Sequence, residues 1–543
     1  MKLKKVLSMV LTGVVMTSVL AGCSGNPEGD AVKTTQLESS VSDNQNPEST
    51  EGTKEAAVET SDGEMSEITV ILRTLGTVDE AASEAVEAAV NEITQREINV
   101  AVDLMWIDSA KYETQVPMMI TGNEKMDLMM YTPNPSTTYN TLMAQRQIMD
   151  ITDILNEYGP EIKATLGDEL FKATSRDGRI YGVGNYGPLT FKGMLMVRRD
   201  LADAAGVTEK IENASTWTEI KEALKAISDQ SGQGLVNVDL NGSVLMPTPV
   251  LLAGENFSDG YVYDNLGDSS NMFMANKKSG KVECLYFNDD VREVLKRTYD
   301  WYQEGIVYKD AALSKDFGAT LLKNGVGCGL ITTTEVGGEQ ATAATTGYDM
   351  IVLNPVDESA PMITTGSLTK FGFCVPVTAL EPEAAMKFLN LLYTKESGLG
   401  NLLSWGIEGR DYVVNEDGLA EFPEGVTADN VPYHIAEFLY GNRLNVTPWI
   451  GSDPDVRQIQ QAVNDTAEVS PYLGFNLDNT GMEATLTACS NVFEKYKRTL
   501  LSGSSSEDFD TYYKKFLDEL TAAGIDELVS AYQEQLDTWM KNN

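Results

Sequence analysis

Residues 68–106, ITVILRTLGTVDEAASEAVEAAVNEITQREINVAVDLMW, decide the fold class because their hydrophobic period changes twice. Residues 68–72 form a short apolar run, and apolar side chains alternate with polar ones over 100–106, as they do in strands. Between them, alanine, valine and isoleucine recur at helical spacing over 78–95. The stretch therefore predicts a strand, a helix and a second strand.

The same order continues downstream. Residues Tyr112–Ile120 have a helical pattern that ends at Thr121-Gly122, where glycine is placed for a left-handed cap, and Asp127–Tyr131 reads as a third strand. Alternating units of this kind predict a mostly parallel sheet with helices on both faces. Ligands bind such sheets beyond the carboxyl ends of the strands, so we expect the loop at residues 131–135 to lie near a binding site.

The first 23 residues have the three parts of an export signal. Lysines stand at positions 2, 4 and 5, residues 6–20 carry no charge, and Leu20-Ala21-Gly22-Cys23 matches a lipobox. This predicts a signal peptide at residues 1–22 and a lipid on Cys23 that anchors the chain to the outer face of the bacterial cell membrane. An ordinary signal peptide or a short anchor helix is the alternative. Residues 24–66 lack aromatic side chains and any hydrophobic period, which is typical of a disordered linker.

Composition excludes several classes of partner. The formal net charge of −40 repels nucleic acid and anionic lipid, so neither is expected to bind, and contact with the membrane is expected through the lipid only. Four cysteines follow Cys23, at spacings too wide for a metal motif. Two of them, Cys328 and Cys374, lie in apolar runs and are expected to be buried free thiols.

Several segments, taken in order, resemble one family. Tyr112–Met129 is similar to a helix, turn and strand of that family, although Met126 replaces the usual proline, and Leu195–Leu201 is similar to its crossover into a second lobe, although only Asp200 of the expected Tyr-Asn-Lys-Asp remains. The other segments are Gly178–Val183, Ser215–Ile220, Lys323–Leu330 and Pro382–Asn390. Together they resemble the extracellular solute-binding proteins of ABC importers, family 1, of the maltodextrin-binding type.

Two later segments narrow the resemblance. Trp405–Gly409 and Ser470–Phe475 are similar to elements of lipoprotein binders that have an uncharacterised C-terminal domain, although Arg410-Asp411-Tyr412 departs from their pattern. Helices are expected at Met482–Tyr496 and Phe509–Trp539, where apolar residues recur every three or four positions, and the resemblance implies that they pack on the second lobe.

The resemblance implies an α/β, two-lobed periplasmic-binding-protein fold with a hinge between the lobes and extra C-terminal helices. Crossings between the lobes are expected near 183–188 and 357–363. The implied N-terminal lobe comprises residues 67–185 and 360–425, and the C-terminal lobe comprises residues 186–359 and 426–543.

An exported hydrolase, such as a glycosidase, is the competing class, but no catalytic pair can be named. The single histidine, His434, is expected at the surface or an interface, and the chain has no Gly-x-Ser-x-Gly, His-Glu-x-x-His or phosphate-binding Gly-Lys-Ser/Thr element. Residues 264–268 have the composition of a calcium loop but not its ligand spacing. The sequence therefore predicts no enzyme, no cofactor and no metal.

A sugar site needs flat aromatic faces for the apolar side of the ring and planar polar groups for its hydroxyls. Such residues are expected on loops at strand ends and in the regions where the family binds its ligands, although aromatic side chains can equally pack in the core and most carboxylates face solvent. The candidates are Tyr131, Asn134, Asn185, Tyr186, Thr333, Thr334, Glu335, Trp405, Glu408 and Trp449.

The predicted function is the capture of a solute between two closing lobes and its delivery to the permease subunits of an ABC importer. By resemblance the favoured solute is a carbohydrate or oligosaccharide, and a peptide or another polar metabolite is the alternative. The protein is expected to act as a monomer outside the cytoplasm.

Overall fold

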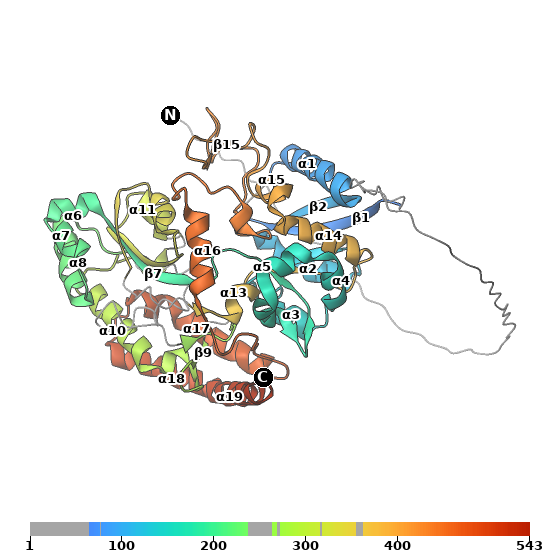
Figure 1. Ribbon diagram of the computed structural model, residues 1–543. Helices are drawn as coiled ribbons and strands as arrows, with labels where there is room; N and C mark the ends of the chain where they lie inside the picture. Colours follow the sequence, from blue (N-terminus) through green and yellow to red (C-terminus); the bar gives the residue numbers. More distant parts are fainter. Residues whose placement is uncertain are drawn as a thin grey trace, which may run out of the picture. The chain divides into compact units, whose positions relative to one another are not determined.

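The computed structural model describes residues 64–75, 78–236, 263–268, 272–314, 316, 318–354 and 362–543 (Figure 1). They belong to one unit, Ser61–Asn543. The predicted signal peptide, Cys23 and nearly all of the predicted linker lie outside the described residues, as does most of the predicted crossing at 357–363. Among the described residues, none of the helices combines the length and the apolar composition that crossing a membrane requires.

The predicted strand, helix and strand are present at the start of the first lobe. β1 (Ser66–Thr74) and β2 (Val100–Asp108) pair in parallel over their whole length, and α1 (Glu80–Ile98) connects them. Three consecutive residues of β1, Val70–Leu72, are 0% exposed. Because consecutive side chains of a strand point to opposite faces, both faces of the sheet are covered here, as the sequence predicts.

The rest of the first sheet is less parallel than predicted. Its order is β2-β1-β3-β14-β6, with β3 at Leu128–Tyr131, β14 at Gly372–Cys374 and β6 at Val183–Gly184. β3 is parallel to β1, but β14 is antiparallel to both β3 and β6. The antiparallel strand comes from a segment more than 200 residues downstream, which a local β-α-β pattern does not reveal.

The predicted left-handed cap at Gly122 is wrong by one residue. α2 (Ser109–Thr121) is followed by Gly122 in the right-handed conformation, with φ −73°. The left-handed residue is Asn123, with φ 54°. Asparagine tolerates this conformation better than most residues, so the turn does not need glycine at that position.

The second lobe contains an antiparallel sheet of order β11-β7-β12. β7 (Phe191–Arg198) lies between β11 (Gly329–Glu335) and β12 (Met350–Leu353). Residues 185–190 lead into this sheet from β6 of the first. The described helices of this lobe include α6 (Arg199–Ala205), α7 (Thr208–Glu212), α8 (Trp217–Ser231) and α10 (Asp289–Gln303).

The C-terminal region ends in three helices rather than the two predicted. These are α17 (Glu483–Ser502), α18 (Phe509–Ala522) and α19 (Ile525–Asn542), and Gly524 with φ 99° separates the last two. They share an apolar core with α10, β9 (Phe273–Asn276) and β10 (Val282–Cys284), beside which they run in Figure 1.

The first core continues past residue 425, because Tyr433, Ile435, Leu439 and Tyr440 are buried in it. All four cysteines of the described chain are buried and free, which confirms the prediction for Cys328 and Cys374. The remaining helices are α3 (Tyr139–Ala144), α4 (Thr152–Tyr158), α5 (Pro160–Phe171), α11 (Gly318–Lys323), α12 (Glu339–Ala344), α13 (Thr365–Thr369), α14 (Pro382–Tyr393), α15 (Leu399–Trp405) and α16 (Val456–Thr466). Short strands and 3-10 turns are β4 (Ser175–Arg176), β5 (Arg179–Ile180), β8 (Tyr263–Asp264), β13 (Met362–Ile363), β15 (Val413–Val414), β16 (Ala420–Glu421), β17 (Glu468–Val469), η1 (Lys172–Thr174), η2 (Leu285–Phe287), η3 (Ala311–Leu313), η4 (Lys395–Ser397) and η5 (Arg443–Asn445).

Candidate functional site

Corresponding ends of the two sheets carry a set of aromatic and charged side chains. Arg73 lies at the end of β1. Gly372, the first residue of β14, pairs with Tyr131, the last residue of β3, so Lys370 and Phe371 lie at that same end of the sheet. In the second sheet, Glu335 at the end of β11 pairs with Phe191 at the start of β7. The strand-end site is defined here by Arg73, Phe191, Glu335, Lys370, Phe371 and Phe438.

Ring contacts connect these residues across the two lobes. The Arg73 guanidinium lies 5.6 Å from the centroid of the Phe371 ring, whose centroid is 5.6 Å from that of Phe438. The Lys370 ammonium lies 5.2 Å from the centroid of Phe191, which belongs to the second sheet. Phe191 is 39% exposed and Phe438 is 37% exposed, so each ring presents apolar surface to solvent. Exposed aromatic faces beside charged groups are suited to binding a sugar ring.

A buried network of ion pairs anchors Glu335. Arg443 contacts the Glu335 carboxylate at 2.5 Å and the Glu437 carboxylate at 2.5 Å, and Arg457 contacts Glu437 at 2.5 Å. Burial alone would raise the pKa of Glu437, but the charges of Arg443 and Arg457 and the hydrogen bonds they donate hold it below its usual value. The Arg443 N–H also donates to the Tyr186 carbonyl at 2.8 Å, so the network joins β11 to the segment that crosses between the lobes.

The predicted residues at the first crossing serve the backbone. The Asn185 amide donates to the Leu439 carbonyl at 2.6 Å and accepts from the Gly441 N–H at 3.2 Å. Tyr186 is 6% exposed, and its hydroxyl accepts from the Gln461 amide at 3.0 Å. The Asn185 side chain therefore fixes residues 439–441 against the crossing, and the Tyr186 side chain joins the crossing to α16 (Val456–Thr466).

The predicted residues at the strand ends differ in exposure. Tyr131 is 0% exposed and donates its hydroxyl to the Leu368 carbonyl at 2.8 Å, so its ring has no face available to a solute in this structure. Asn134 and Thr333 are half-buried. Thr334 is buried and shares a 2.9 Å hydrogen bond with Thr342.

Trp405 and Trp449 belong to a compact aromatic cluster with Phe422 and His434. Trp405 is 3% exposed and donates its indole N–H to the Thr447 carbonyl at 2.9 Å. His434 stacks on it with ring centroids 4.9 Å apart, and Trp449 lies 4.5 Å from His434. Burial lowers the pKa of His434. The rings of this cluster pack directly against one another. The exposed Glu408 lies at the edge of the cluster, where it forms an isolated β-bridge with Tyr412.

Among the ten predicted residues, the structure places Glu335 in the strand-end site and brings Trp405 together with Trp449 elsewhere. A role of any of the ten in ligand binding stays a prediction. Sequence reasoning missed Arg73, Phe191, Lys370, Phe371 and Phe438. Their position next to a strand could have indicated them, because Phe191 is the first residue of one strand and Lys370-Phe371 directly precedes another. An aromatic residue at the start of a strand is, however, equally typical of a buried core.

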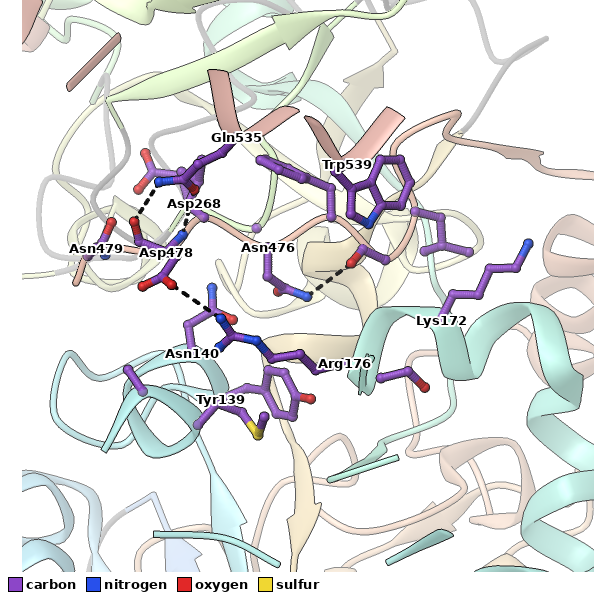
Figure 2. A pocket seen from close by; sticks show the side chains of 18 of the residues that line it. Tyr139, Asn140, Lys172, Arg176, Asp268, Asn476, Asp478, Asn479, Gln535 and Trp539 are labelled. Carbon is purple, nitrogen blue, oxygen red and sulfur yellow. Dashed lines mark hydrogen bonds and ion pairs between the residues drawn. The ribbon is translucent and has the colours of Figure 1, made fainter. Parts of the chain in front are cut away.

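A separate cavity of about 2050 Å³ lies between the first lobe and the C-terminal region (Figure 2). Its walls include Tyr139, Asp268 and Trp539, and none of the ten predicted residues lines it. Its two cationic residues are both paired, Arg176 with Asp478 at 3.2 Å and Lys172 with Glu169 at 2.7 Å. Asp268, which ends the segment of calcium-loop composition, accepts hydrogen bonds from the Met272 and Phe273 N–H groups. No cluster of three potential metal ligands occurs in the described part of the chain.

Aromatic and charged groups at adjoining ends of the two sheets are suited to binding a small ligand. The chain belongs to the bacterial extracellular solute-binding protein family, whose model matches residues 77–398. A domain of unknown function, DUF3502, matches residues 471–541. Both matches confirm the resemblance seen in the sequence, and the family places the chain outside the cytoplasm.

Solved structures share this architecture. The N-glycan transport solute-binding protein NgtS from Streptococcus pneumoniae is similar with a TM-score of 0.73 and 17% identity, over 88% of this chain and 99% of that one. An HMO-binding solute-binding protein associated with an ABC transporter of Bifidobacterium longum infantis has a TM-score of 0.60 and 16% identity, over 88% and 100%. These likenesses confirm the two-lobed fold. No curated protein matches the chain.

Proposed function

We propose that this protein captures a carbohydrate, most simply an oligosaccharide, at the strand-end site and delivers it to the permease of an ABC importer. The observation that carries the proposal is the exposed apolar surface of Phe191 and Phe438, one on each side of the site, beside charged groups. The similar structures named above bind or transport glycans, according to their descriptions, which supports the same class of solute here.

The geometry suits a sugar for a physical reason. The C–H groups on one side of a pyranose pack on the Phe191 and Phe438 rings, while Arg73, Lys370 and Glu335 offer donors and acceptors to its hydroxyls. Lys370 and Phe191 belong to different lobes, so a solute between them stabilises one relative position of the lobes. A permease can recognise the loaded protein through that difference in shape.

The proposal includes an anchored binding protein that leaves its solute unchanged. A lipid on Cys23 would hold the protein on the outer face of the membrane, near its permease, as a monomer. Replacement of Cys23 by serine is expected to release the protein into the medium, measured by immunoblot of cells and supernatant. Retention of the Cys23→Ser variant on cells would count against the anchor and leave the binding function untouched.

A thermal-shift screen of the chain from Ser61 onward against mono- and oligosaccharides tests the binding function. A ligand present at 100 times its dissociation constant adds about 2.7 kcal/mol to the unfolding free energy. The products of each hit are analysed after long incubation. A shift with intact sugar supports the proposal, cleavage supports the exported hydrolase, and shifts only with peptides or other metabolites would reject carbohydrate as the solute.

Phe438→Ala tests the location of the site. Loss of an exposed ring that contacts ligand should weaken binding of every sugar hit by about tenfold or more, because aromatic contacts dominate such sites. Phe287→Ala is the matched control, since Phe287 is 44% exposed and lies outside both the strand-end site and the cavity. Equal affinity of the two variants, measured by calorimetric titration, would move the binding site elsewhere.

A further inference from the structure

Two cations of the strand-end site have no protein partner that neutralises them. Arg73 is 9% exposed, and its Nε atom is buried without a hydrogen-bond partner. No carboxylate of the described residues lies within ion-pair distance of its guanidinium or of the Lys370 ammonium. Each cation contacts the face of a phenylalanine ring instead.

Such an arrangement is costly in the unliganded protein. Removing a charge from water without a paired counter-charge is unfavourable, and an aromatic face compensates only part of this. Burial lowers the pKa of both Arg73 and Lys370, as expected for cations that lose hydration. The charge of Glu335 favours the charged form of Lys370, and that of Asp108 favours the charged form of Arg73, but burial outweighs both, and Glu335 is already paired with Arg443.

The other two buried cationic residues of the described chain, Lys192 and Arg198, are each paired with a carboxylate. The two cationic residues that line the cavity beside the C-terminal region are each paired with a carboxylate, and so are Arg443 and Arg457. With 81 acidic and 41 basic residues, the chain has carboxylates in excess. A pair of cations without carboxylates in such a chain marks a place where an anion is to be supplied from outside.

We propose that the solute of the strand-end site is an acidic carbohydrate whose carboxylate binds between Arg73 and Lys370. This inference rests on the proposed function, since it names the class of sugar bound at the same site. The planar guanidinium of Arg73 matches a carboxylate in two parallel hydrogen bonds, and the ammonium of Lys370 adds a point charge. Phe371, Phe438 and Phe191 pack on the apolar side of the same sugar.

The test compares matched pairs of oligosaccharides of two to four units, uronic acid members against their neutral counterparts, in the glucose, galactose and mannose series. Calorimetric titration of the wild-type protein should give at least one acidic member that binds roughly ten- to a hundredfold more tightly than its neutral counterpart. This preference should shrink as salt is added.

Arg73→Met and Lys370→Met keep the apolar part of each side chain and remove the charge. Each is expected to abolish most of the acidic preference while affinity for neutral sugars persists. Lys172→Met is the matched control, because it removes a cation that is paired and 55% exposed, and it should leave the preference unchanged. The unliganded Lys370→Met variant should be at least as stable as the wild type, since an unpaired charge is removed.

The outcomes separate this inference from the function on which it rests. Neutral members that bind as tightly as acidic ones, or variants that retain the preference, would overturn the acidic solute and leave a carbohydrate-binding protein. Failure of every carbohydrate to bind the wild type would overturn both. If a variant does not fold, the comparison of acidic and neutral members on the wild-type protein decides alone.

Discussion

The buried ion network at Glu437 gives the strongest prediction for stability. Replacement by glutamine keeps the shape of the side chain and removes the charge that faces Arg443 and Arg457, whose side chains are 14% and 11% exposed. In the Glu437→Gln variant, Glu335 is the one carboxylate of the network that remains to balance the charges of Arg443 and Arg457. Removing one partner of a buried pair costs about 3–5 kcal/mol, and the limited exposure of these residues places the expected loss near 3 kcal/mol.

The assay is urea unfolding followed by fluorescence and circular dichroism between pH 3 and pH 8. Because the pKa of Glu437 is lowered in the folded state, its contribution is complete above the ordinary value of 4.5 and is lost as the pH falls through the folded pKa. The gap between wild type and Glu437→Gln should therefore stay constant down to about pH 5 and narrow below it.

Glu519→Gln is the control, because Glu519 pairs with Lys495 on the surface at 2.6 Å and should change stability little. A loss for Glu437→Gln no larger than for this control, or a gap that does not change with pH, would refute the account of the network as a buried and mutually neutralised set of charges.

Three further predictions concern local structure. Thr216→Ala removes the capping box at the start of α8 and should lower the unfolding free energy by about 1 kcal/mol, measured by urea unfolding. Gly474→Ala should lower the unfolding free energy by about 2 kcal/mol in the same assay, because φ is +98° and the added Cβ would lie 2.9 Å from the Lys172 carbonyl oxygen. Gly481→Ala is the control and should lower it less, because Gly481 also has a positive φ but open space around it. His434 is the single histidine, so its NMR titration is unambiguous and should give a pKa below 6.5. Because burial favours the neutral imidazole in the folded state, the protein should lose stability as the pH falls below 6.5. A pKa at or above 6.5 would contradict the burial of His434.

Elements were predictable from sequence where the hydrophobic period was strong. The strand at Ser66–Thr74, the helix at Glu80–Ile98 and the strand at Val100–Asp108 contain the predicted segments, because a strand buried on both faces and an amphipathic helix leave different local patterns. The break at Gly524 was not predicted, since the apolar spacing of α18 continues across it into α19. Spacing reports which residues are buried, and two packed helices can share one spacing.

The binding residues were less predictable because exposure depends on distant parts of the chain. Tyr131 is the last residue of β3, which ends toward the site, yet it is fully buried, and the carbonyl of Leu368, 237 residues later, accepts a hydrogen bond from its hydroxyl. Phe438 lies in a loop next to Glu437, and its ring is 37% exposed although it packs on Phe371 from a different segment. An aromatic residue near a strand end is thus a candidate from sequence, and only the tertiary contacts decide whether its face is free.

The C-terminal region is joined unequally to the two lobes, and this constrains any hinge motion. α10 buries Val291 and Leu295 in the core that it shares with α17–α19, and it buries Trp301 in the core of the second lobe. Contacts with the first lobe include polar ones, the Arg176–Asp478 pair at 3.2 Å and the Asn476 amide donating to the Ala173 carbonyl at 3.3 Å, and the burial of Leu473 in the core of that lobe. Separating a shared apolar core costs far more than exchanging half-exposed polar contacts for water. If the lobes move, we therefore expect α17–α19 to follow the second lobe and the polar contacts beside the cavity to change.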